Sequence, residues 1–392
     1  GTLMAERTLW TYADAVDRLC DLFEINEAGR QLRSAKDAVL TAYNDIANRH
    51  PWKYYKRRFP FRTEASYSTG TVVFTFTGGA YERMLTLSAG TWPANAAFGV
   101  VRLGQNHWQV DERKSNTVVT LKAENNPGAN VASTSYEWYR EAYPLPALFR
   151  REYGLIAPAD RRELVHLSPE QWLQSRRAYG DASSSIPQFY TILNDAEYYD
   201  TMQLVIGPPT SSALTLEFAY DAYPRPLLIH EYATGTVSVT INTTAVTSAG
   251  GGAVFISAYE GSVIRFSSTT TVPTSPRGTN PYAFQRIVSV VTPSTSLTID
   301  GAALSTVGSG GFTISDPLDL DSGAMLTAFW RASELELAQL LDNSEADVRR
   351  REQRFARALH LAQDSDRKSD AMDFLNSWDD GLLIGDVDTG HS

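Results

Sequence analysis

The sequence predicts an α+β fold: a helical frame built from both termini, with a small antiparallel β meander, interrupted by two related inserted β modules of sandwich or barrel type. Three observations predict it. Segments near both ends carry apolar residues at helical spacing. The middle of the chain alternates apolar and hydroxyl residues, as half-buried strands do. One block of sequence occurs twice, and internal repetition constrains architecture strongly.

The repeated block organises the chain. The first copy reads Tyr67-Ser68-Thr69-Gly70-Thr71-Val72, then Gly99-Val100-Val101-Arg102-Leu103, then Asn116-Thr117-Val118-Val119-Thr120-Leu121. The second copy reads Tyr232-Ala233-Thr234-Gly235-Thr236-Val237, then Gly261-Ser262-Val263-Ile264-Arg265-Phe266, then Ser294-Thr295-Ser296-Leu297-Thr298-Ile299. A Pro/Gly-rich insert at 271–281 makes the second copy longer. Two copies are too few for a solenoid, so we expect two β modules, at 63–135 and 230–311.

The remaining segments form the predicted frame. We assign N-terminal helices to 1–62, short helices and the β meander to 136–229, and C-terminal helices to 312–363. Thr11 and Asp14 have the spacing of a helix N-cap, and so do Ser168 and Gln171. The meander strands are expected at 188–193, 202–206 and 214–220, because turn residues separate them. An acidic arm at 364–392 follows the frame.

Composition limits the class of protein. A chain of 392 residues with 43% apolar residues predicts two or three domains with real cores. The net charge of −10 argues against a protein that grips nucleic acid over its whole surface, but it is compatible with a channel through which DNA slides. The single cysteine, Cys20, is expected in the core of a helix and excludes an internal disulfide. No apolar run reaches the roughly 18 residues of a membrane span, and we expect no secretion signal.

The search for catalytic chemistry finds no phosphate-binding loop, dinucleotide fingerprint, zinc-protease motif or nucleophile elbow. His230 and Glu231 mark the expected exposed entry to the second β module rather than an acid/base pair. Asp316, Asp319 and Asp321 have the oxygen ligands that Ca²⁺ prefers, but acids before a helix also stabilise its N-terminus without a metal. We expect no catalytic residue, no cofactor and no metal. Four tryptophans are expected in cores rather than on sugars: Trp92, Trp108, Trp138 and Trp172.

An aromatic and basic stretch lies at 52–62. Its cations Lys53, Lys56, Arg57 and Arg58 are candidates for a patch that contacts phosphate or a partner. The alternative is an edge strand that leaves the preceding helix with its aromatic residues inward and its charges outward. The isolation of the stretch in an acidic chain favours the edge strand.

Three features together resemble structural proteins of tailed bacteriophages. They are an N-terminal helix pair with Tyr43-Asn44-Asp45-Ile46-Ala47 running into Trp52, a central run from Tyr143-Pro144-Leu145-Pro146 through Ser168-Pro169-Glu170 to Pro208-Pro209, and Ser315-Asp316-Pro317-Leu318-Asp319-Leu320 before a helix. The chain is most similar to a head-to-tail connector, the adaptor that docks beneath the portal. The resemblance implies a virion protein at the head–tail interface, assembled in the host cytoplasm as a ring of twelve copies, with the DNA passing through its lumen without specific binding.

The resemblance also implies a C-terminal arm that contacts the portal protein. The arm contains apolar residues among many aspartates, and Gly381 and Gly385 are expected to break any free-standing helix there. The hypothesised docking residues are Met372, Phe374, Leu375, Trp378, Leu382, Leu383 and Ile384. Related short adaptors are mostly helical, so the two β modules are a departure from the pattern. They leave open two alternatives. One is a tail-tube or nozzle component; the other is a fibre-anchoring, receptor-side virion protein in which the β modules are the binding domains. An enzyme such as a polysaccharide-degrading tail protein is disfavoured.

Overall fold

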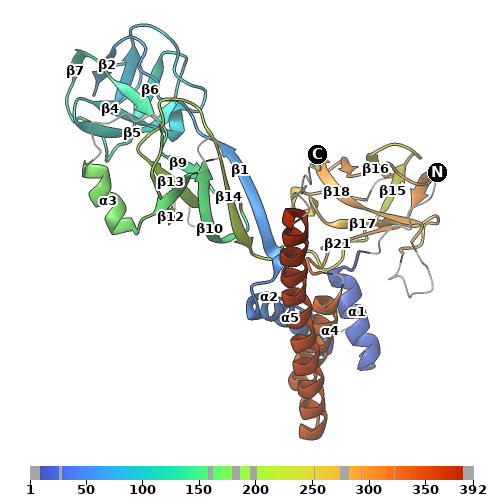
Figure 1. The fold of residues 1–392 in the computed structure, drawn as a ribbon. Coiled ribbons are helices and arrows are strands. Elements are labelled where there is room, and N and C mark those ends of the chain that lie inside the picture. The colour runs from blue at the N-terminus through green and yellow to red at the C-terminus, as the bar shows by residue number, and fades with distance from the viewer. Residues whose placement is uncertain are drawn as a thin grey trace, which may run out of the picture. The chain divides into compact units, whose positions relative to one another are not determined.

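The computed structural model describes residues 9–25, 29–157, 162–178, 186–194, 201–250, 252–273, 282–292, 294–321 and 323–382, without the side chains of 153–157, 162, 177–178 and 368–382. The chain has a mixed α+β fold (Figure 1). It divides into two compact units: a helical unit of Gly1–Tyr54 with Pro224–Ser392, and a sheet unit of Tyr55–Tyr223. Each unit contains one copy of the repeated block.

The first β module belongs to the sheet unit. Its strands are β2 (Val72–Thr75), β3 (Met84–Leu87), β4 (Val100–Leu103), β5 (Asn106–Arg113), β6 (Val118–Leu121), β7 (Val131–Thr134) and β8 (Glu137–Tyr139). They form one curled antiparallel sheet in the order β7-β2-β3-β6-β5-β4-β8. A short 3-10 helix, η2 (Ala96–Phe98), precedes β4.

The second β module belongs to the helical unit. Its strands are β15 (Thr236–Val239), β16 (Ala245–Ala249), β17 (Val263–Phe266), β18 (Phe284–Thr292), β19 (Ser296–Ile299), β20 (Val307–Gly310) and β21 (Phe312–Ser315). Their order is β20-β15-β16-β19-β18-β17-β21, again antiparallel throughout. The 3-10 helix η3 (Ser257–Tyr259) precedes β17.

The two modules have the same topology, strand for strand, which confirms the predicted relationship. The register irregularities also correspond: the first lies between Val72 and Phe74 in one module and between Val237 and Val239 in the other. Both modules continue past their predicted ends at 135 and 311. The last strand of each, β8 or β21, pairs with the strand that carries the repeated arginine, so the chain leaving the module completes its sheet.

Each module encloses its own apolar core, because alternate residues along its strands point inward. The first core contains the fully buried Trp92 and Trp138, and the second contains the fully buried Phe255, Phe266 and Phe312. Each of these aromatic side chains buries about 150–250 Å², more than an aliphatic side chain does.

The rest of the sheet unit is a third sheet. Its strands are β1 (Lys56–Arg62), β9 (Ala142–Pro144), β10 (Phe149–Ala157), β11 (Arg162–His166), β12 (Phe189–Asn194), β13 (Met202–Gly207) and β14 (Thr215–Ala222). The order is β1-β14-β10-β11-β12-β13-β9, and β11 and β12 run parallel. The expected meander is therefore correct for β12 and β13 only, since β14 pairs with β1 and β10. Helix α3 (Pro169–Ala178) lies between β11 and β12 in the chain.

The helical unit contains four long helices in its described part, α1 (Tyr12–Leu22), α2 (Arg30–Arg49), α4 (Ala324–Leu340) and α5 (Glu345–Leu382), and the single turn η1 (Lys53–Tyr55) begins at its boundary. The predicted N-cap of α1 is present: Thr11 and Asp14 form a reciprocal capping box. Helix α4 packs against α1, α2 and α5 and buries residues on most of its surface. Helix α5 continues through the predicted boundary at 363 and ends at Leu382, one residue after Gly381.

The frame expected to be continuous is divided. Its helices belong to the helical unit with the second β module, while the predicted meander belongs to the sheet unit with the first. The sequence pattern locates each element but does not tell which elements share a core, because that depends on contacts distant in the chain.

Candidate functional site

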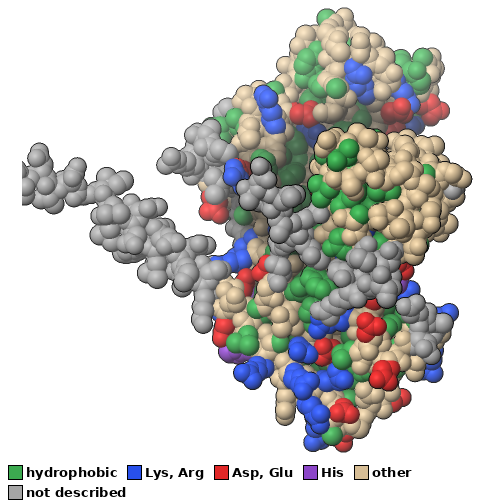
Figure 2. Space-filling model, turned by 90° about the vertical axis from the view of Figure 1, so that its right-hand side faces the viewer, with side chains coloured by type: hydrophobic (Ala, Val, Ile, Leu, Met, Phe, Trp, Pro, Cys, Tyr) green, Lys and Arg blue, Asp and Glu red, His purple; other side chains and the backbone are tan. Residues whose placement is uncertain are grey.

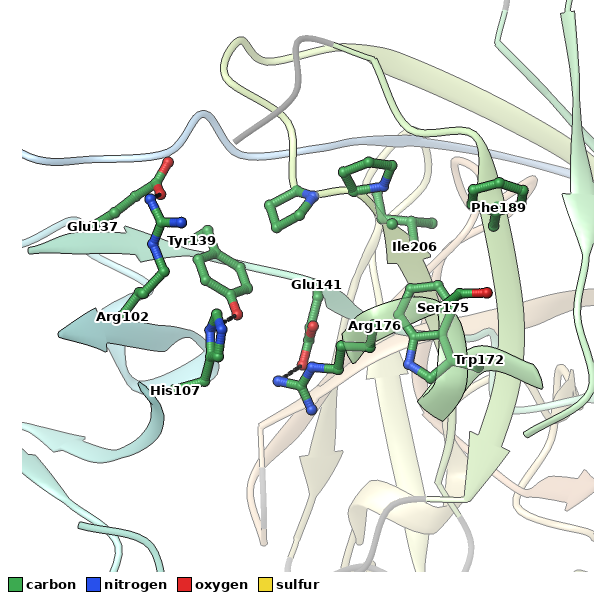
Figure 3. Close-up of a pocket in the computed structure, with 13 residues that line it drawn as sticks. Arg102, His107, Glu137, Tyr139, Glu141, Trp172, Ser175, Arg176, Phe189 and Ile206 are labelled. Carbon is green, nitrogen blue, oxygen red and sulfur yellow. Dashed lines mark hydrogen bonds and ion pairs between the residues drawn. The ribbon is translucent and has the colours of Figure 1, made fainter. Parts of the chain in front are cut away.

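A hollow in the sheet unit gathers polar and aromatic side chains from the first β module, helix α3 and strand β13. Its cavity volume is about 40 Å³. Its lining residues are Arg102, His107, Glu137, Tyr139, Glu141, Trp172, Ser175, Arg176, Phe189, Ile206, Gly207, Pro208 and Pro209. Figure 3 shows Arg102 and Glu137 at one end, Trp172 and Ile206 at the other, and Glu141 with Arg176 between them.

Three polar pairs lie in a row along the hollow (Figure 3). Because side chains alternate along extended backbone, Glu137, Tyr139 and Glu141 face the same side. Arg102 Nη2 lies 2.7 Å from Glu137 Oε2, and Arg176 Nη2 lies 2.8 Å from Glu141 Oε1. Between them, a hydrogen bond of 2.8 Å joins the Tyr139 hydroxyl to Nδ1 of His107. The row thus joins residues of β4, β5, β8 and α3.

The apolar wall depends on a glycine. A Cβ atom at Gly207 would lie 2.4 Å from the Trp172 ring, so the indole packs where a side chain would otherwise be. The peptide bond between Gly207 and Pro208 is cis. Trp172 is buried, as expected for a core tryptophan, and so are Trp92 and Trp138, while Trp108 is partly buried against the first module's core.

Burial governs the ionisation of the pairs. It raises the pKa of Glu141, against the opposing effect of the Arg176 guanidinium. It also raises the pKa of Tyr139, with a smaller contribution from Glu141. Burial by itself lowers the pKa of Arg176, but Glu141 and Tyr139 raise it overall. The Arg102–Glu137 and Tyr139–His107 pairs join strands within the first β module, and the Arg176–Glu141 pair fixes α3 to the segment that follows β8, so the arrangement is suited to holding these elements together.

The predicted basic patch is not one cluster. Lys56, Arg57 and Arg58 lie exposed on β1, which pairs with β14 at the edge of its sheet as described, and Arg58 donates to Glu217 Oε2 at 2.6 Å. Phe59 and Phe61 of the same strand pack against the core of the third sheet. This is the expected edge strand with aromatic residues inward. Lys53 belongs instead to η1, where its backbone N–H donates to Asp366 Oδ1 at 3.2 Å.

The other sequence candidates have structural partners. His230 is half-buried with its ring against Tyr12 at 5.1 Å, so its expected exposure is wrong. Asp316 accepts hydrogen bonds from Leu228 N at 2.7 Å and Ser262 Oγ at 2.7 Å. Contrary to the expectation, it does not lie at the N-terminus of a helix. In the part of the chain that the structure describes, no three His, Cys, Asp or Glu side chains are grouped as metal ligands. Cys20 is buried on α1, as expected.

Two features were not recognised as functional from sequence. The row in the hollow has no sequence signal, because its residues come from four elements. The second is a basic stretch at the start of α5, with five arginines between 349 and 357, which is visible in the sequence itself. Of the hypothesised docking residues, Met372, Phe374, Leu375, Trp378 and Leu382 belong to α5, and their side chains are not described. Leu383 and Ile384 lie outside the described residues.

Comparison with family models, with curated protein sequences and with solved structures finds no match to this chain. None of the described helices is both long enough and apolar enough to cross a membrane.

Proposed function

We propose that this protein is a structural virion protein, a head-to-tail adaptor that forms a ring beneath the portal of a tailed bacteriophage and continues the DNA channel to the tail. The proposal rests on the resemblance of the segments named above. One structural observation supports it: two of those segments, far apart in the chain, meet in the helical unit. The Tyr43 hydroxyl donates to the carbonyl of Arg225 at 2.8 Å and accepts from the N–H of Asp319 at 3.3 Å.

The same junction includes the start of the aromatic stretch. The Tyr54 hydroxyl donates to Asp319 Oδ1 at 2.9 Å, and Asp319 Oδ2 accepts from the N–H of Arg225 at 3.1 Å. Tyr43 also packs edge-on against Phe329 of α4 at 6.3 Å between ring centroids. Hydrogen bonds therefore join α2, the segment around Arg225 and the segment before α4, as expected of a helical unit that keeps its shape in an assembly.

In the proposed adaptor, the helical unit forms the ring and the C-terminal part of α5 contacts the portal. The β modules are outward additions, and no cofactor is needed. DNA crosses the lumen without specific binding, because each phosphate paired to a fixed cation would add affinity and slow its passage. We expect the lumen to be lined mainly by acidic and uncharged residues, in keeping with the net charge of −10.

Electron microscopy of the purified chain, alone and mixed with portal rings, tests the proposal. A closed ring with a central opening, formed alone or on the portal, is the expected result. A trimer would favour the fibre-anchoring alternative. A chain that stays monomeric in both samples would rule out the adaptor.

A further inference from the structure

Helix α5 is divided by charge. Residues 349–357 contain five arginines and one glutamate, a formal net charge of +4. Residues 370–388 contain six aspartates and no lysine or arginine, a formal net charge of −6. The backbone is one continuous helix from Glu345 to Leu382, so both charged stretches begin on the same helix.

The basic stretch presents an exposed stripe. Arg350, Arg354 and Arg357 are exposed and recur at spacings of four and three, which places them on one face of the helix. Arg350 pairs with Asp347 at 3.8 Å, and both side chains are more than half exposed. Among described residues, Arg354 and Arg357 have no side-chain ion pair or hydrogen bond. Figure 2 shows Lys and Arg side chains gathered at the lower end of the view, the level at which Figure 1 draws the start of α5.

The two neighbouring acids are already engaged in their own chain. Asp364 lies 3.2 Å from His360 Nδ1 on the same helix. Asp366 Oδ2 lies 2.9 Å from His50 Nε2, and its Oδ1 accepts from the N–H of Lys53. Because Asp364 and Asp366 already have partners in their own chain, the acidic stretch is counted from Asp370 onward.

The acidic stretch cannot reach the basic stripe of its own copy. Asp370 follows Arg357 by 13 residues on one helix, about 20 Å along its axis at 1.5 Å per residue. Leu382 lies about 38 Å beyond Arg357 by the same measure. Asp388 follows Leu382 by six residues, which span about 21 Å at full extension whatever their conformation. The two stretches therefore cannot pair with each other within one molecule.

We propose that the exposed stripe of Arg350, Arg354 and Arg357 binds the acidic stretch 370–388 of a second copy of this chain. Charge complementarity identifies the occupant, since the chain as a whole is acidic and the stripe is a local exception. Exposed ion pairs are individually weak and screened by salt, so several must act together. This proposal names a contact between the copies of the chain that form the proposed ring, and it rests on that proposed function. The aspartates differ from the apolar residues proposed to dock on the portal.

Two charge-reversal variants of the full chain test the proposal. Variant one carries Arg350→Glu, Arg354→Glu and Arg357→Glu, so its stripe and its acidic stretch are both negative. Variant two carries Asp370→Lys, Asp373→Lys, Asp379→Lys and Asp380→Lys, which changes the net charge of its acidic stretch from −6 to +2, so both regions are positive. Self-association is measured by analytical ultracentrifugation without portal, at 50 and 500 mM NaCl. We expect the wild type to associate more than tenfold less tightly at the higher salt, and each variant alone to lose at least tenfold in affinity.

Mixing the two variants distinguishes pairing from misfolding. In the mixture every negative stripe meets a positive partner stretch and every positive stripe meets a negative one, so association is expected to return. The matched control, Arg30→Glu with Arg33→Glu, reverses two exposed charges on α2 and should associate as the wild type does. Failure of the mixture to recover would overturn the proposal. So would a monomeric wild type, or one whose stripe binds duplex DNA instead. Portal attachment is measured separately, so its loss bears on the proposed adaptor alone.

Discussion

Arg265 of β17 and Asp14 of α1 form a buried bidentate ion pair, although 251 residues separate them in the chain. Arg265 Nη1 donates to Asp14 Oδ1 at 2.7 Å, and Nη2 donates to Oδ2 at 2.6 Å. The side chains are 4% and 2% exposed. Nη2 also donates to the carbonyl of Leu9 at 2.8 Å, so the start of α1 is fixed to the second β module.

The first prediction concerns this pair. Asp14→Ala leaves a guanidinium buried without its counter-charge and removes the capping box of α1. We expect the free energy of unfolding to fall by roughly 3–5 kcal/mol, measured by urea denaturation. Asp45→Ala, which removes the solvent-screened pair with Arg49 and the repulsion between Asp45 and Glu336, should cost less than about 1 kcal/mol. Equal losses in the two variants would contradict the importance of burial.

The same arginine position in the first β module has a different partner. Arg102 occupies the position of Arg265, but its carboxylate comes from Glu137 in the adjoining strand. The residue opposite Arg265 is Thr313, which has no charge, and Asp14 of α1 supplies the carboxylate instead. The repeat thus retains the cation while the surrounding unit determines its counter-charge.

This difference shows what the sequence could predict. The order of the repeated blocks was enough to predict two modules of one topology, because strand pairing follows local alternation and turn positions. The partner of each arginine could not be predicted, since Asp14 and Glu137 are ordinary acids whose meaning depends on a contact made elsewhere in the chain. The hollow beside Tyr139 was missed for the same reason.

The second prediction tests a packing difference between the modules. Gly99 and Ser262 directly precede β4 and β17, and a Cβ at Gly99 would lie 2.1 Å from Trp138 Nε1. The second module has Ile314 where the first has Trp138, which leaves room for Ser262. Gly99→Ala should therefore destabilise the protein by about 1–3 kcal/mol in thermal or urea unfolding. Gly308→Ala, with nothing within 4 Å of its added Cβ, is the control and should change stability by about 0.5 kcal/mol or less.

The third prediction is a pH dependence. Burial, and to a smaller extent Lys36, lowers the pKa of His230 to about 4 from its usual 6.5. Its Nε2 atom is buried without a hydrogen-bond partner among the described residues. The unfolded chain binds the proton more readily than the folded one between these values, so stability contributed by neutral His230 is present above pH 6.5 and is lost as pH falls towards 4.

Replacing His230 removes that contribution. We expect the wild type to lose roughly 1–3 kcal/mol more than His230→Phe between pH 7 and pH 4.5, because phenylalanine keeps the ring contact with Tyr12 and cannot bind a proton. Urea titrations at the two pH values measure the difference. The exposed His360 provides the control, and His360→Gln should follow the wild type. Parallel pH profiles for wild type and His230→Phe would rule out the buried neutral histidine.

The last prediction concerns portal attachment. The arm expected at 364–392 would be removed by truncation after Gln363. However, Asp366 contacts His50 and the N–H of Lys53, so a cut there would also weaken the packing of α5. Truncation after Arg367 keeps that contact and removes every hypothesised docking residue. The shortened chain should remain folded, with an unfolding midpoint within a few degrees of the full chain, and should fail to co-sediment with portal rings. Asp366→Asn in the full chain is the matched control: it weakens the packing contact yet should retain portal attachment. If the truncated chain binds portal rings with the affinity of the full chain, the docking arm is disproved.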